Sequence, residues 1–136
     1  MNTKTKGDIS EAAVLSALIK AGYVVLLPWG DKERYDLVVD HNGQFYRVQV
    51  KTGRYKNGCV RFFSCSKHAR QGHRESYVGQ IEYFAVYSFK LDKCYLIPIQ
   101  DSCETETSLR VEPTKNQQDY KVRWAKDYEI NSMSLV

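Results

Sequence analysis

Residues 34–51 constrain the fold most, because they read as two short strands joined by a tight turn. The dipeptide Asn42-Gly43 separates two runs of alternating residues and is typical of a hairpin whose two central residues have positive φ. Pairing of these strands brings Asp36, on the first, towards Gln49 and Lys51 on the second. Side chains two residues apart leave the same face of a strand. We therefore expect a carboxylate, an amide oxygen and an ammonium group to converge at one point.

An amphipathic helix is predicted over residues 8–21, ahead of the hairpin. Its apolar side chains recur at helical spacing, and Gly22 supplies a stop signal. At about 100° per residue, Glu11 falls beside Leu15 and Leu18, on the flank of the buried stripe. We expect its carboxylate to face another part of the molecule. An ordinary carboxylate on the flank of a helix is the alternative.

The rest of the chain is expected to complete one sheet and to end in a helix. A surface loop is predicted over 64–79, an acidic loop over 101–106 and a C-terminal helix over 116–128. The run 81–89 is rich in aromatic and aliphatic residues without strict alternation, which is typical of a strand covered on both faces. The other strands are predicted at residues 23–27, 59–64 and 93–99.

Positive charge is concentrated in one part of the sequence. The 136-residue chain has a formal net charge of +4 at pH 7, but residues 47–74 contain basic side chains and no acidic one. Such a local field favours a polyanionic partner, and the aromatic residues between the basic ones suit contact with nucleic acid. A solvated charged surface is the alternative. The predicted DNA contacts are Arg54, Lys56, Arg61, Lys67, His68, Arg70, His73 and Arg74.

Length and cysteine usage indicate the number of domains, the state of the thiols and the cellular location. A chain of 136 residues predicts a single domain over 1–136. The four cysteines lack paired C-x-x-C spacing and no secretory leader precedes the first predicted helix, so we expect free thiols and a cytoplasmic location. No apolar run approaches the roughly 20 residues that span a bilayer, so we expect no membrane partner.

Asp36 followed by Gln49-Val50-Lys51 resembles the PD-(D/E)XK nuclease pattern, in which a carboxylate on one strand of a hairpin faces D/E/Q-x-K on the next. The sequence departs from that pattern at Tyr35, which replaces a proline, and at Gln49, which replaces the usual acidic metal ligand. Within this superfamily, most of the chain is similar to the branch that contains homing endonucleases of bacterial group I introns. This similarity is carried by residues 6–11, 34–36, 49–54 and 109–116.

The resemblance implies an α/β fold with a restriction-endonuclease-like core, in which a central mixed β-sheet carries an N-terminal helix and a C-terminal helix. It implies metal-dependent hydrolysis of DNA, with Mg²⁺, or Mn²⁺ in its place, as cofactor. The implied catalytic residues are Asp36, Gln49, Lys51 and Glu11. The implied metal ligands are Asp36, Gln49, Glu11 and the Val50 carbonyl, with Asp8 as a reserve.

The expected partners are double-stranded DNA and further copies of the chain. A domain of this size spans only about ten base pairs and holds one active site, so a double-strand break calls for at least a dimer. The resemblance to intron endonucleases implies a tetramer.

Other interpretations stay open. A Holliday junction resolvase or a restriction-type endonuclease would use the same residues. A DNA-binding module that has lost cleavage would explain the neutral Gln49. A cross-strand ion pair between Asp36 and Lys51 would explain the motif without any active site.

Overall fold

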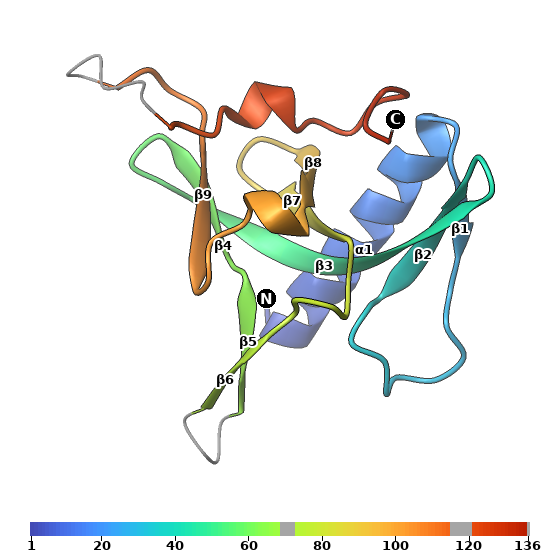
Figure 1. The fold of residues 1–136 in the computed structure, drawn as a ribbon. Coiled ribbons are helices and arrows are strands. Elements are labelled where there is room, and N and C mark those ends of the chain that lie inside the picture. The colour runs from blue at the N-terminus through green and yellow to red at the C-terminus, as the bar shows by residue number, and fades with distance from the viewer. Residues whose placement is uncertain (69–72, 115–120, 136) are drawn as a thin grey trace.

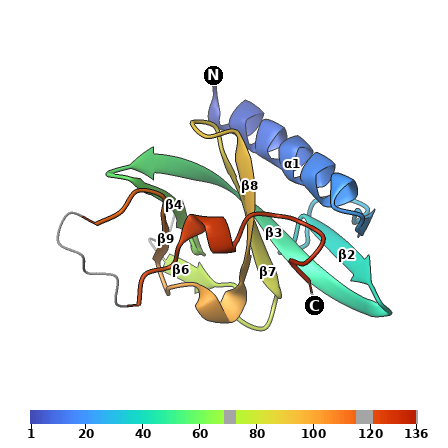
Figure 2. The same cartoon turned by 90° about the horizontal axis from the view of Figure 1, so that it is seen from above.

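The computed structural model describes residues 1–68, 73–114 and 121–135. A single long helix, α1 (Thr3–Lys20), lies along one face of a seven-stranded sheet (Figure 1). The C-terminal segment begins on the opposite face, with Ala125, and passes along the edge of β8 to the helix side, where Leu135 is buried (Figure 2). Within the described residues, no helix is both long and apolar enough to cross a membrane.

The long strand β3 (Gln44–Lys56) is the centre of the sheet. Along its length it pairs in turn with β2 (Leu37–His41), with β7 (Tyr83–Ser88) and with β4 (Cys59–Phe63). The β7 pairing is parallel and the other two are antiparallel, so the predicted mixed sheet and the fold class are confirmed. The outer strands are β1 (Val24–Leu26), which pairs with β2, β8 (Lys93–Pro98), which pairs with β7, and β9 (Glu106–Arg110), which pairs with β4.

The β2–β3 hairpin forms as predicted. Asn42 and Gly43 have φ of 52° and 77°, the left-handed conformation that this turn requires. The register pairs Leu37 with Val48, so the apolar side chains of both strands face α1.

The sheet is packed on both faces. On one face, Val14 and Leu18 of α1 are fully buried against β2 and β3. On the other, the rings of Phe62 and Phe84 lie 5.4 Å apart, in a cluster that includes Ala125 of the C-terminal segment. The two faces explain why β7 and β8 are apolar on both sides, as the sequence predicted for 81–89.

Two predicted elements near the start and middle of the chain are wrong in detail. The helix begins at Thr3, because the Asn2 side chain accepts a hydrogen bond from the Thr5 N–H at 2.8 Å, so Asp8 lies inside the helix rather than at its start. Residues 64–79 contain a hairpin of β5 (Cys65–His68) and β6 (His73–Ser76), not an irregular loop.

The predicted C-terminal helix over 116–128 is wrong within its described part, residues 121–128. Trp124 is extended and forms an isolated bridge with Arg110, and only the short 3₁₀ helix η2 (Ala125–Asp127) follows. The Tyr128 carbonyl accepts from the Leu96 N–H at 2.8 Å, so this segment binds the edge of β8 instead of coiling on itself. Residues 115–120 of the prediction lie outside the described residues.

Gly53 marks the point where β3 passes from its partner β7 towards β4. A Cβ atom at Gly53 would lie 2.6 Å from Val60 Cγ1 and 2.9 Å from Val86 Cγ1, closer than real Cβ contacts. Two buried side chains therefore occupy the space that a methyl group would need.

We expect Gly53→Ala to lower the free energy of unfolding by about 1–3 kcal/mol, since overpacking forces side chains and backbone to shift. Gly7→Ala in α1 is the matched control. No atom lies within 4 Å of its Cβ position, and the helix should gain about 0.5–1 kcal/mol. Urea unfolding of both variants measures this, and a Gly53→Ala protein as stable as the wild type would contradict the packing described.

Candidate active site

Asp36 is held by hydrogen bonds from both its backbone and its side chain to the backbone of β3. Its N–H donates to the Val48 carbonyl at 2.8 Å, and its Oδ2 accepts from the Val50 N–H at 2.8 Å. The first bond continues the backbone pairing of β2 with β3, and the second holds the half-buried carboxylate against β3. The side chain is thereby oriented before any ligand is present.

Glu11 reaches the same point from the helix. Its carboxyl group shares a hydrogen bond with Asp36. The helix is held in place one residue earlier, where the buried Ser10 hydroxyl lies 2.7 Å from the Thr52 hydroxyl on β3. The prediction that Glu11 faces another part of the molecule agrees with this position.

The two carboxyl groups shift each other's titration. The pKa of Glu11 is raised to about 7, first by loss of water around it and then by the charge of Asp36 and the hydrogen bond to it. Burial also raises the pKa of Asp36, although the Val50 N–H, the Glu11 bond and the charge of Lys51 act in the opposite direction. Below about pH 7 the Glu11 carboxyl keeps its proton and can donate it to the Asp36 carboxyl, so the pair then carries less than its full negative charge.

Gln49 lies beside this pair with its nitrogen facing inwards. In the orientation that satisfies its neighbours, the amide nitrogen donates to the Arg34 carbonyl at 2.6 Å and to Asp36 Oδ2 at 3.2 Å. The amide oxygen, which metal coordination would use, faces away from Asp36 in this arrangement. A half-turn of the amide exchanges the two atoms.

Lys51 follows on the same face of β3, and its Nζ donates to the Tyr77 hydroxyl at 3.2 Å. In the part of the chain that the structure describes, no ion pair joins Lys51 to Asp36. The cross-strand ion pair that would have explained the motif without an active site is therefore not formed.

Two adjoining hollows border the carboxyl pair. One, of about 310 Å³, is lined by Asp8, Glu11 and Asp36 together with apolar side chains. Asp8 is exposed and lies 3.9 Å from Lys4, which makes it a weaker partner of the site than Glu11. The second hollow, of similar size, adds the acidic residues Asp31 and Glu33 from the loop before β2.

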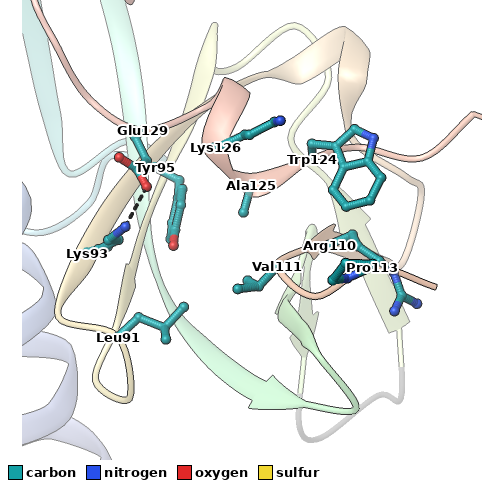
Figure 3. A pocket seen from close by; sticks show the side chains of 10 residues that line it. All are labelled: Leu91, Lys93, Tyr95, Arg110, Val111, Pro113, Trp124, Ala125, Lys126 and Glu129. Atoms are coloured by element: carbon teal, nitrogen blue, oxygen red, sulfur yellow. Dashed lines mark hydrogen bonds and ion pairs between the residues drawn. The ribbon is translucent and has the colours of Figure 1, made fainter. Parts of the chain in front are cut away.

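A larger hollow of about 470 Å³ lies elsewhere, between β8, the end of β9 and the C-terminal segment (Figure 3). Its one acidic side chain, Glu129, is paired with Lys93 at 2.8 Å. Tyr95, Val111 and Trp124 supply much of its wall. This hollow has none of the paired acidic oxygens found beside Asp36.

The predicted DNA contacts are distributed over β3, β4 and the β5–β6 hairpin. Glu106 of β9 forms ion pairs with two of them: its carboxylate oxygens lie 3.1 Å from Arg54 Nη2 and 3.8 Å from Arg61 Nη1. The basic stretch 47–74 contains no acidic residue, but a strand distant in sequence supplies one. The other six predicted contacts lie in β3 and in the sequence around β5 and β6. Lys56, His73 and Arg74 are exposed, Lys67 and His68 lie in β5 where only the backbone is described, and Arg70 lies outside the described residues.

Comparison with known proteins identifies the family. The model of the PD-(D/E)XK endonuclease family matches residues 1–131. The chain belongs to the PD-(D/E)XK endonuclease family. Among solved structures, this endonuclease is similar to a bacterial homing endonuclease, I-Ssp6803I, with 30% sequence identity over 95% of this chain and 89% of that chain, and a TM-score of 0.77. No curated protein matches it.

Family membership makes the protein a nuclease, and nucleases of this family typically use divalent metal ions.

Three residues that surround the endonuclease motif were not predicted from the sequence. Ser10 and Thr52 tie the helix to β3, and Tyr77 contacts Lys51. Ser10 carried a usable signal, since a polar residue in the buried stripe of the helix needs a partner. Tyr77 carried none, because it lies in a segment without periodicity.

The pKa values predict how Glu11 affects stability in the metal-free endonuclease. The pKa of Glu11 is higher in the folded protein than in the unfolded one, so its protonation stabilises the fold. This contribution is fully present below about pH 4.5 and is lost as the pH rises through about 7. Glu11→Gln cannot ionise, so we expect it to melt at a higher temperature than the wild type at pH 8 and at nearly the same temperature at pH 4.5.

Glu129→Gln is the control, because it makes the same chemical change at a carboxylate that pairs with Lys93 at the surface, away from Asp36. Its melting temperature should follow that of the wild type at both pH values. Thermal melts in EDTA give the measurement, and a Glu11→Gln variant no more stable than the wild type at pH 8 would count against the carboxyl pair.

Proposed function

We propose that this endonuclease hydrolyses double-stranded DNA at a specific site, in the manner of a homing endonuclease, with Mg²⁺ or Mn²⁺ as cofactor. The observation that supports it best is the close pairing of Asp36 with Glu11 beside Lys51. Burial raises the pKa of both acidic groups, so ionising both calls for positive charge beyond that of Lys51. A divalent cation would supply it.

The donors at this point fit a hard cation. Across the described residues no three His, Cys, Asp or Glu side chains gather as metal ligands, so the two carboxylates would be joined by neutral oxygens. Gln49 Oε1, after a half-turn of its amide, and the Val50 carbonyl are the candidates. Mg²⁺ prefers such oxygen ligands and retains several waters, which makes a short protein ligand set sufficient.

Each side chain then has a distinct part in the reaction. When bound, Mg²⁺ polarises the phosphate and lowers the pKa of the attacking water. Asp36 and Glu11 would hold the ion, and Glu11 would release its proton on doing so. Gln49 contributes a neutral oxygen, which attracts the ion less than the usual carboxylate would. Lys51 stabilises the negative charge that grows on the phosphate oxygens, a role worth about 10²- to 10³-fold in rate.

The setting we propose follows from the same features. The whole of residues 1–136 acts as one nuclease domain, and a homo-oligomer, a dimer or a tetramer, makes the double-strand break, because one copy carries one site of this kind. All four cysteines are free, which suits the cytoplasm. Similarity to a bacterial homing endonuclease favours homing over junction resolution or restriction.

A binding module without cleavage is the second candidate, and the orientation of Gln49 favours it. Its amide nitrogen, not its oxygen, faces Asp36. Incubation with plasmid, four-way junction and intron-insertion-site DNA in Mg²⁺ separates the candidates. Cleavage of the insertion site alone supports homing, and cleavage of none supports binding without cleavage.

We expect Asp36→Asn to abolish metal-dependent cleavage while the dissociation constant for DNA stays within about tenfold of wild type, since the contacts that position DNA lie on phosphates and not on this carboxylate. Asp92→Asn makes the same chemical change in the β7–β8 turn and should cleave normally. Gel assays of cleavage and fluorescence anisotropy of a labelled duplex give the two numbers. Persistent cleavage by Asp36→Asn would rule out the proposed metal site.

Glu106 gives a separate test of the basic surface. Because it engages both Arg54 and Arg61, it competes with DNA phosphates for them. We expect Glu106→Gln to bind duplex DNA more tightly and to steepen the fall of log K with log salt by up to about two slope units, about one for each arginine that gains a phosphate.

Glu129→Gln is the control for net charge, because it removes one acid that pairs with Lys93 at a distance from these arginines. Salt titrations of binding compare the two variants. If Glu106→Gln has the same salt slope as Glu129→Gln, Arg54 and Arg61 do not contact phosphates.

A further inference from the structure

Tyr77 joins the motif lysine to the β5–β6 hairpin. It follows β6 directly and is 4% exposed. Its hydroxyl accepts from Lys51 Nζ at 3.2 Å, and the same Nζ lies 4.9 Å from the centre of its ring. The edge of Phe84, 5.5 Å away in a T-shaped contact, fixes the plane of the ring. The ring therefore offers Lys51 both an acceptor oxygen and a π face.

Arg34 contacts the Tyr77 ring and binds the segments around it. Its guanidinium carbon lies 3.9 Å from the centre of the Tyr77 ring. Its Nε donates to Gln80 at 2.6 Å and its Nη1 to the Ser66 hydroxyl at 2.7 Å, while Nη2 donates to the Ser76 carbonyl at 3.2 Å. Arg34 thus contacts β5, β6 and the turn after Tyr77. Its own carbonyl accepts from the Gln49 amide, two residues before Lys51.

The contact with Tyr77 restricts the conformation of the Lys51 side chain. A lysine ammonium sits on a flexible four-carbon chain and adopts many rotamers unless something selects one. A direct ion pair with Asp36 is one such choice, and it would occupy the carboxylate that the proposed cation binds. In the described structure the ammonium lies on Tyr77 instead.

We propose that Tyr77 is a positioning residue, which holds the Lys51 ammonium against its hydroxyl and ring and clear of Asp36, and that Arg34 ties this arrangement to the β5–β6 hairpin. The inference rests on the proposed nuclease function for its effect on rate. The placement of Lys51 itself does not depend on that function, so the two are tested separately.

The variant that tests it is Tyr77→Phe, which keeps the ring and removes only the acceptor oxygen. We expect single-turnover cleavage to slow roughly 10- to 100-fold, the range typical of residues that orient a group in a site. Affinity for the duplex, measured without a divalent metal ion, should stay within about twofold, because the buried hydroxyl does not face DNA phosphates. Tyr87→Phe removes a hydroxyl bonded to Asp92 at 2.8 Å and should cleave as the wild type does.

NMR of the metal-free, DNA-free protein gives a readout that does not need activity. Because Lys51 Nζ lies over the Tyr77 ring, 4.9 Å from its centre, we expect the ring current to shift the signals of the adjoining ε-methylene protons away from those of other lysines. The signals are assigned from the spectrum of Lys51→Arg. In Tyr77→Phe they should move towards the ordinary lysine position, and in Tyr87→Phe they should not move.

Lys51 signals that are unchanged in Tyr77→Phe would overturn the proposal, whether or not cleavage slows. A wild-type cleavage rate in Tyr77→Phe would overturn it as well. If the wild type cuts no DNA, the nuclease function fails, and the NMR comparison still decides whether Tyr77 holds Lys51.

Discussion

The hydrogen bond from the Val50 N–H to the Asp36 carboxylate, at 2.8 Å, links the active-site acid to the backbone of the central strand. It exists only in one register of β2 on β3, the one that the turn at Asn42 and Gly43 sets. A slip of one residue would reverse every side chain on the strand. Lys51 would then point into the core under α1, and Val48 would face the site. Site and core therefore depend on the same pairing.

This dependence explains which parts could be predicted. The turn dipeptide, the alternation and the motif all lie within residues 34–51, so local rules are sufficient to place Asp36 near Gln49 and Lys51. The direction of Glu11 was predicted for a related reason, because the buried stripe of a helix sets the direction of every other side chain on it. The family resemblance supplied the overall fold, which local patterns alone do not specify.

The unpredicted parts are held by contacts distant in sequence. The β5–β6 hairpin has little apolar periodicity, and polar bonds from Arg34 attach it to the core. Glu106 pairs with Arg54 and Arg61 from the first residue of β9, at the end of the predicted acidic loop. The spacing of Trp124 and Tyr128 fits a helix, yet their backbone pairs with β9 and β8 instead. Tertiary hydrogen bonds override such weak local preferences.

The central claim is that Asp36 and Glu11 together bind a divalent cation. Its most direct test is a crystal structure of the protein with uncleaved duplex and Mn²⁺, with data collected to show the anomalous signal of manganese. We expect an anomalous peak at coordinating distance, about 2.0–2.2 Å, from oxygens of both Asp36 and Glu11, with a phosphate oxygen beside it. Phosphate bound next to Lys51 with no manganese between the two carboxylates would contradict it.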